Sequence, residues 1–125
     1  MMYRYFISIS IATKGIPKYC NLFFGSEEKI TRDNWDEVNE KVSEQIGEKS
    51  ENIVLGNPIL FEEIKSEESE IYFISYIGKL GEYIFNGSCW YKTVIYGEET
   101  IREIEEFLSK ECEQEVVIIS IEKKG

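Results

Sequence analysis

The chain has 125 residues, of which 42% are apolar and 14% aromatic. This composition supports a packed core and excludes a disordered protein. The 24 acidic and 14 basic residues give a net charge of −10 at pH 7, which disfavours binding to nucleic acid or an anionic membrane and favours cationic partners. No apolar stretch reaches the ~20 residues of a membrane-spanning helix, and no signal-peptide pattern precedes the first strand, so we expect a cytoplasmic protein.

The first half of the sequence predicts two strands, a helix and a third strand. Apolar and polar side chains alternate over residues 3–12, which is typical of a strand with one buried face, and a second extended segment spans residues 19–24. In residues 52–61, Gly56-Asn57-Pro58 interrupts a third strand and indicates a bulge or an edge position, because proline cannot donate to the ladder. A helix is predicted between them from apolar residues at helical spacing, which are Trp35, Val38, Val42 and Ile46.

The same pattern starts again after a charged segment, residues 62–70, that we interpret as a solvated spacer. The run Tyr72-Phe73-Ile74-Ser75 repeats Tyr5-Phe6-Ile7-Ser8 letter for letter. A strand at about residues 88–96 and a final strand at 116–119 are expected, with a tight turn at Asn86-Gly87. The helix between these strands has its predicted core at Ile101, Ile104 and Leu108.

Four elements in the same order, occurring twice, predict an α+β fold made of two tandem β-β-α-β repeats. The units would span residues 1–61 and 71–125, joined by the spacer 62–70 in one compact domain. Convergent patterning of ordinary elements is the alternative. Because one unit of this size buries too little surface to be stable alone, we expect the units to share a core. The predicted arrangement is one mixed sheet with parallel crossovers, two helices on one face and an approximate two-fold axis.

The sequence lacks the residues of most catalytic sites. Histidine is absent, and neither a phosphate-binding Gly-x-x-x-x-Gly-Lys loop nor a Gly-x-Gly-x-x-Gly motif is present. The only aspartates, Asp33 and Asp36, lie near a predicted helix start, where they favour capping. Three cysteines without Cys-x-x-Cys spacing favour reduced thiols over a disulfide or zinc site. We therefore expect no enzyme, no metal and no cofactor.

Acidic residues line one face of each predicted helix and form the first candidate site. In the first helix they recur at spacings of four, three, four and four residues, and like charges at such spacings destabilise a helix. If both helices lie on one face of the sheet, their stripes would form one negative surface that imitates nucleic acid and occupies a basic groove. An ordinary solvated face is the alternative. The residues are Asp33, Glu37, Glu40, Glu44 and Glu48, with Glu99, Glu103 and Glu106 in the second helix.

A second candidate site is an aromatic, asparagine-bearing cluster that follows the first strand of each unit. Aromatic rings beside amide groups can stack on a nucleotide base and hydrogen-bond to it, although such residues are more often part of the core. A phosphate would also require basic side chains to converge locally. The candidate ligand-binding residues are Asn21, Phe85, Asn86, Trp90 and Arg102.

The run Tyr5-Phe6-Ile7-Ser8, a glycine-containing turn, Asn21, a helix and a hydrophobic strand resemble small uncharacterised proteins of phages and prophages of low-GC Gram-positive bacteria. The resemblance covers about the first 60 residues and, more loosely, the second unit. It implies a phage accessory protein, such as an anti-defence or anti-CRISPR inhibitor, but carries no catalytic residues. The leading hypothesis is therefore a non-enzymatic inhibitor, monomeric or homodimeric, that blocks a basic nucleic-acid-binding host protein. The alternatives are a small-molecule binder that sequesters a nucleotide signal and a phage structural or accessory subunit.

Overall fold

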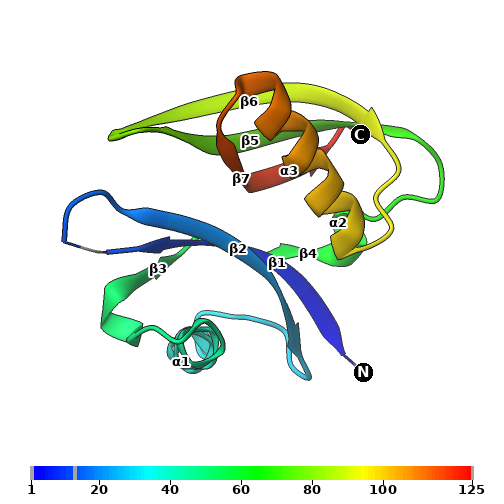
Figure 1. Cartoon of the computed structure of the whole chain (residues 1–125). Coiled ribbons are helices and arrows are strands. Elements are labelled where there is room, and N and C mark those ends of the chain that lie inside the picture. Colours follow the sequence, from blue (N-terminus) through cyan, green and yellow to red (C-terminus); the bar gives the residue numbers. More distant parts are fainter. Residues whose placement is uncertain (1, 13, 125) are drawn as a thin grey trace.

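The computed structural model describes residues 2–12 and 14–124 and has an α+β fold with two antiparallel sheets (Figure 1). The first sheet has the strand order β2-β1-β3, with the short strand β4 also paired to β1, and the second has the order β6-β5-β7. Among the helices in the described part of the chain, none is long and apolar enough to cross a membrane.

The first sheet is built on a long hairpin. β1 (Tyr3–Ile11) pairs antiparallel with β2 (Lys18–Ser26) along its whole length, and β3 (Ile53–Leu55) and β4 (Ile59–Leu60) pair with the opposite edge of β1. The interruption between β3 and β4 confirms the break predicted at Gly56-Asn57-Pro58. Gly56 packs closely against β1, because a Cβ at this position would displace the hydroxyl group of Ser8.

The second sheet is built on a longer hairpin than the sequence predicted. β5 (Glu70–Leu80) and β6 (Tyr83–Thr93) are joined by the two-residue turn Gly81-Glu82, in which Gly81 has a φ of +59°. The tight turn predicted at Asn86-Gly87 is wrong, since both residues lie inside β6.

The glycines of this hairpin have a packing role that the sequence did not reveal. The ring of Phe85 lies over Gly78 and the ring of Tyr76 lies over Gly87, so close that a Cβ at either glycine would be 2.1 to 2.5 Å from the ring. Glycine therefore provides room for a cross-strand ring in an unbroken strand.

The prediction of one mixed sheet with parallel crossovers is wrong. β3 pairs antiparallel with β1, and β7 (Glu115–Lys123) pairs antiparallel with β5. In each sheet the first strand is therefore central, and it separates the second strand from the third. The chain takes this course because each hairpin leaves its first strand with one open edge, which the strand after the helix then fills.

The two long helices lie on opposite sides of the first sheet, not on one face as predicted (Figure 1). α1 (Trp35–Ile46) packs on the face that carries Ile7, whereas α3 (Glu98–Cys112) packs on the second sheet in the cluster that contains Phe6. Neighbouring residues of a strand point to opposite faces, and both Phe6 and Ile7 are fully buried. The second half of the chain therefore covers the remaining face of the first sheet.

The helical spacing predicted the core positions of α3 and two of the four in α1, where Trp35 and Ile46 are only half-buried. α1 ends at Gly47, whose φ of +75° lies in the left-handed region that favours glycine. A short 3₁₀ turn (Ser50–Asn52) leads from there to β3. The buried apolar side chains of the two helices are Val38 and Val42 in α1, and Ile101, Ile104 and Leu108 in α3.

The segment predicted as a solvated spacer is partly buried. It contains α2 (Phe61–Ile64), in which Ile64 is 1% exposed, and the buried Ser66. The Tyr72 hydroxyl lies 2.7 Å from both the Ser66 hydroxyl oxygen and the Ile64 carbonyl oxygen. The apolar and hydroxyl residues of the segment thus anchor it to the second sheet, while Glu62, Glu63, Glu67 and Glu68 remain exposed.

Candidate functional site

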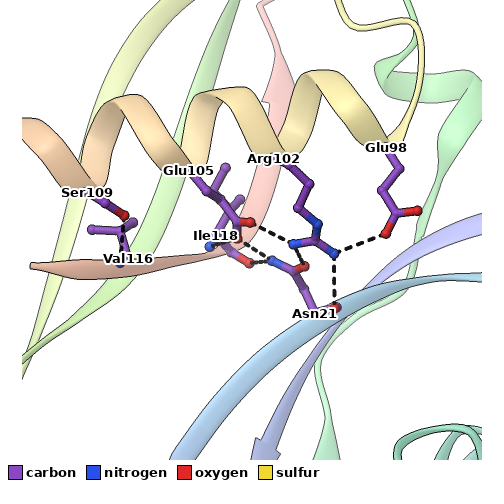
Figure 2. Close-up of polar contacts among 7 residues, drawn as sticks. All are labelled: Asn21, Glu98, Arg102, Glu105, Ser109, Val116 and Ile118. Carbon is purple, nitrogen blue, oxygen red and sulfur yellow. Dashed lines mark hydrogen bonds and ion pairs between the residues drawn. The ribbon is translucent and has the colours of Figure 1, made fainter.

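Two of the predicted ligand-binding residues, Asn21 and Arg102, contact each other across the two halves of the chain (Figure 2). Asn21 lies on β2, 8% exposed, and Arg102 lies on the first half of α3. The guanidinium group donates to the Asn21 side-chain oxygen at 2.5 Å and, from its other nitrogen, to the Asn21 backbone carbonyl at 3.4 Å. Residues 81 positions apart therefore form one polar cluster at the interface of the two sheets.

Glu105 completes this cluster and was not singled out by the sequence. Its carboxylate accepts hydrogen bonds from Arg102 at 2.6 Å, from the Asn21 amide at 2.8 Å and from the Ile118 backbone N–H at 2.9 Å. Glu98 adds a second carboxylate 3.2 Å from Arg102. The available signal was the helical spacing Glu98–Arg102–Glu105, which places both acids beside one arginine.

The cluster caps the free edge of β7. Ile118 donates its N–H to Glu105, and its carbonyl oxygen accepts from the Asn21 amide at 2.7 Å (Figure 2). Two residues earlier, the Val116 N–H donates to the hydroxyl oxygen of Ser109 at 3.0 Å. Side chains thus satisfy backbone groups that an edge strand would otherwise leave open.

The electrostatics of the cluster favour a stable arrangement of charges. Burial lowers the pKa of Arg102. The hydrogen bonds to Glu105 and Glu98 and the charges of these two carboxylates raise the pKa by more than burial lowers it, so the pKa of Arg102 is above its usual value. Both amide hydrogens of Asn21 are already used, by Glu105 and by Ile118. A ligand at Asn21 would therefore have to displace a contact that joins the two halves.

The other predicted ligand-binding residues lie elsewhere, on β6. Phe85 covers Gly78 on the face of the second sheet that packs against α3. Asn86 and Trp90 lie on the opposite face, where the indole, 63% exposed, is 5.0 Å from the Phe73 ring between centroids. The structure therefore does not bring the five candidates into one pocket.

Three surface cavities, of about 240, 350 and 180 Å³, lie among the described residues. The first is formed by the two hairpin ends and includes Tyr19, Lys18 and Lys79 in its lining. None of these three cavities is lined by any of the five residues predicted to bind a ligand.

All the predicted acidic residues are exposed, but they form two separate surfaces. The α1 stripe lies on the outer side of the first sheet and the α3 stripe lies in the second half of the molecule (Figure 1). The single continuous negative surface expected from the sequence is therefore not formed. Two ion pairs at the ordinary i,i+4 spacing involve the stripes, Glu37 with Lys41 and Glu106 with Lys110.

Burial opposes activation of two of the three thiols. Cys20, Cys89 and Cys112 are free and half-buried, and burial raises the pKa of Cys20 and of Cys89, which reduces their thiolate content at neutral pH. Within residues 2–12 and 14–124, no group of three or more acidic or thiol side chains is arranged to hold a metal ion.

Comparisons of the chain with protein-family models, with curated proteins and with solved structures found no match.

Proposed function

We propose that the protein is a non-enzymatic binding protein whose acidic α1 face occupies a basic, nucleic-acid-binding surface of another protein. The observation that carries this proposal is the charge distribution on α1. The outward side of the helix and its flanks has five exposed carboxylates, and its last turn contains no basic residue. These residues are Asp33, Glu37, Glu40, Glu44 and Glu48.

The charge pattern of α1 opposes its own stability. Glu44 lies in the last turn and Glu48 just beyond it, near the negative end of the helix dipole, where cations are favoured. Glu40 and Glu44, four residues apart, repel each other by a few tenths of a kcal/mol. An unfavourable arrangement that folding does not require suggests a surface adapted to a cationic partner.

The α3 stripe is the weaker candidate. Arg102 pairs with both Glu98 and Glu105 on that helix, and Lys110 lies in the last turn beside Glu106. Lys41 likewise pairs with Glu37 in α1. What separates the helices is that Glu98 and Glu105 of α3 bind Arg102 in the cluster that joins the two halves, so these charges serve the fold. Glu99 and Glu103 remain as a smaller acidic patch that a large partner would contact separately.

The partner class follows from charge and shape. A helix with carboxylates at regular intervals resembles a row of phosphates, so the proposed target is a protein with a groove for nucleic acid. The phage-type resemblance of the first half makes host anti-phage defence proteins, including CRISPR effectors, the first targets to test. In that setting the protein would be an anti-defence inhibitor.

We also infer that the chain arose by duplication of one β-β-α-β unit. The support is that β1-β2-α1-β3 and β5-β6-α3-β7 have the same element order and the same antiparallel pairing. The repeated Tyr-Phe-Ile-Ser run starts two positions into each first strand. An approximate two-fold relation between the units is part of this proposal.

The test is affinity capture from a bacterial host lysate, followed by release of the captured protein with duplex DNA or RNA. A variant with Glu40, Glu44 and Glu48 replaced by Lys should capture nothing. A control variant with the exposed Glu63, Glu67 and Glu68 replaced by Lys has the same total charge and should bind normally. Equal loss in both variants would mean that only total charge matters, and capture that nucleic acid does not reverse would refute the proposed site.

A further inference from the structure

The outer edge of β6 differs from every other sheet edge in the described part of the chain. β6 is an edge strand of 11 residues without proline, and Lys92 is its only charged residue. Twenty-four acidic residues are distributed over the chain, yet none lies in β6. Natural proteins usually protect a long edge with charge, proline or a covering element, since an open edge pairs with other strands.

The other edges are protected. β3 and β4 have three and two residues and are separated by Gly56 and Pro58. The β7 edge is capped by Asn21, Glu105 and Ser109. β2 also lacks proline and acidic residues, but it lies against β7 of the second sheet, and its Asn21 carbonyl oxygen accepts from Arg102. Among the described residues, no side chain from outside the hairpin donates to or accepts from the β6 backbone.

Exposed apolar side chains gather on the same hairpin. Within residues 2–12 and 14–124, eight large hydrophobic residues are exposed, and four of them lie in β5 and β6. Trp90 is 63% and Tyr83 77% exposed, and the Phe73 ring beneath Trp90 belongs to a sheet face that no helix covers. The four residues are Ile71, Leu80, Tyr83 and Trp90.

We propose that β6 pairs antiparallel with β6 of a second copy of the chain, so that two three-stranded sheets form one continuous sheet. The occupant is a second copy because the strand is complementary to itself about Gly87. With Gly87 on the two-fold axis, each Lys92 lies opposite Glu82 of the other copy. The same register places Trp90 opposite Ile84 and Tyr83 opposite Tyr91. In this register, opposite charges face each other across the axis and large apolar side chains of one copy face those of the other.

This dimer is independent of the proposed partner surface, because α1 lies on the far side of the first sheet (Figure 1). Pairing of one edge strand buries less surface than a standard protein interface of about 1,600 Å². We therefore expect a dimer of moderate affinity that dissociates on dilution.

The test is sedimentation equilibrium of the full-length chain over a wide concentration series. The expected result is a reversible transition to twice the chain mass of 14.6 kDa. Glu82→Lys and Lys92→Glu each place two like-charged pairs across the axis and should weaken the dimer about tenfold. The double variant exchanges the two charges and should restore the affinity.

The matched controls are Glu63→Lys and Lys49→Glu, which make the same charge changes at exposed positions away from β6 and should leave the affinity unchanged. Circular dichroism of all variants verifies that they are folded. A wild-type chain that stays monomeric at every concentration would overturn the proposal, whatever else then binds the edge. The proposal would also be overturned if the single variants weakened the dimer and the double variant did not recover its affinity, because the register would then be wrong.

Discussion

The two sheets have the same strand order but differ in how many faces they bury. The first sheet is buried on both faces, by α1 on one and by the second half of the chain on the other. The second sheet is buried on one face, by α3, α2 and the first sheet. The repeated run Tyr-Phe-Ile-Ser makes the difference visible, since Phe6 is 0% exposed and the corresponding Phe73 is half-buried on an open face. Identical local sequence thus acquires different energetic weight from its position in the molecule.

The comparison predicts unequal effects of the same substitution in the two sheets. Phe6→Ala should lower the free energy of unfolding by about 3–5 kcal/mol, because it leaves a cavity between the first sheet and the second unit. Phe73→Ala should cost about 1–2 kcal/mol, because solvent already reaches the ring. Urea denaturation of both variants measures the difference, and equal costs would show that the open face of the second sheet is covered in solution.

A smaller effect is expected at the polar cluster that joins the two sheets. Glu105→Ala removes the acceptor for Asn21, Ile118 and Arg102 and should cost about 2–3 kcal/mol, since buried donors are left unsatisfied. The neighbouring Glu106→Ala breaks only an exposed pair with Lys110 and should cost at most about 0.5 kcal/mol. Denaturant titration of both variants measures the two losses of unfolding free energy. A small loss of similar size in both variants would show that Glu105 does not join the two sheets.

The smallest predicted effect is a loss of stability at alkaline pH that acts mainly on the second sheet. Burial raises the pKa of Tyr72, with partial opposition from the Ser66 hydrogen bond, and burial also raises the pKa of Tyr76 and Cys89. Among the described thiols and phenols whose pKa is raised, only Cys20 lies in the first sheet. At alkaline pH the folded state keeps protons that the unfolded state has released. The stability is therefore fully present below the ordinary pKa values, which are 9.0 for a thiol and 10.0 for a phenol, and it decreases as the pH rises above them.

Free energies of unfolding measured over a pH series test this expectation. Tyr72→Phe should lower stability at neutral pH, because two buried hydrogen bonds are lost, but it should make the decrease above pH 10.0 less steep. Stability that rises with pH in this range would contradict the assignment.

Secondary structure was largely predictable because it depends on local spacing. The periods of α1 and α3, the β1 strand and the break at Gly56-Asn57-Pro58 all follow from nearest-neighbour chemistry. The hairpin of the second sheet was misplaced because glycine has two uses that look the same in sequence. Gly81 provides a positive φ in a turn, whereas Gly78 and Gly87 provide room for a ring.

The candidate site was predictable only in part, for a related reason. Asn21 and Arg102 were recognised as unusual polar residues, but their mutual contact spans 81 positions and depends on how the two sheets pack. Glu105 differs from the other glutamates of α3 only because the β7 edge lies against it. Spacing on a helix shows which side chains share a face, but not what that face meets.

The sequence by itself determined the element types, the helical core positions, the acidic stripe of α1 and the absence of histidine, because these depend on composition and on short-range periodicity. Only the tertiary structure decided that the strands form two antiparallel sheets, that the helices lie on opposite sides of the first sheet and that β6 is left open. These features arise from long-range pairing and burial. The identical runs Tyr5–Ser8 and Tyr72–Ser75 occupy different environments because different elements cover them.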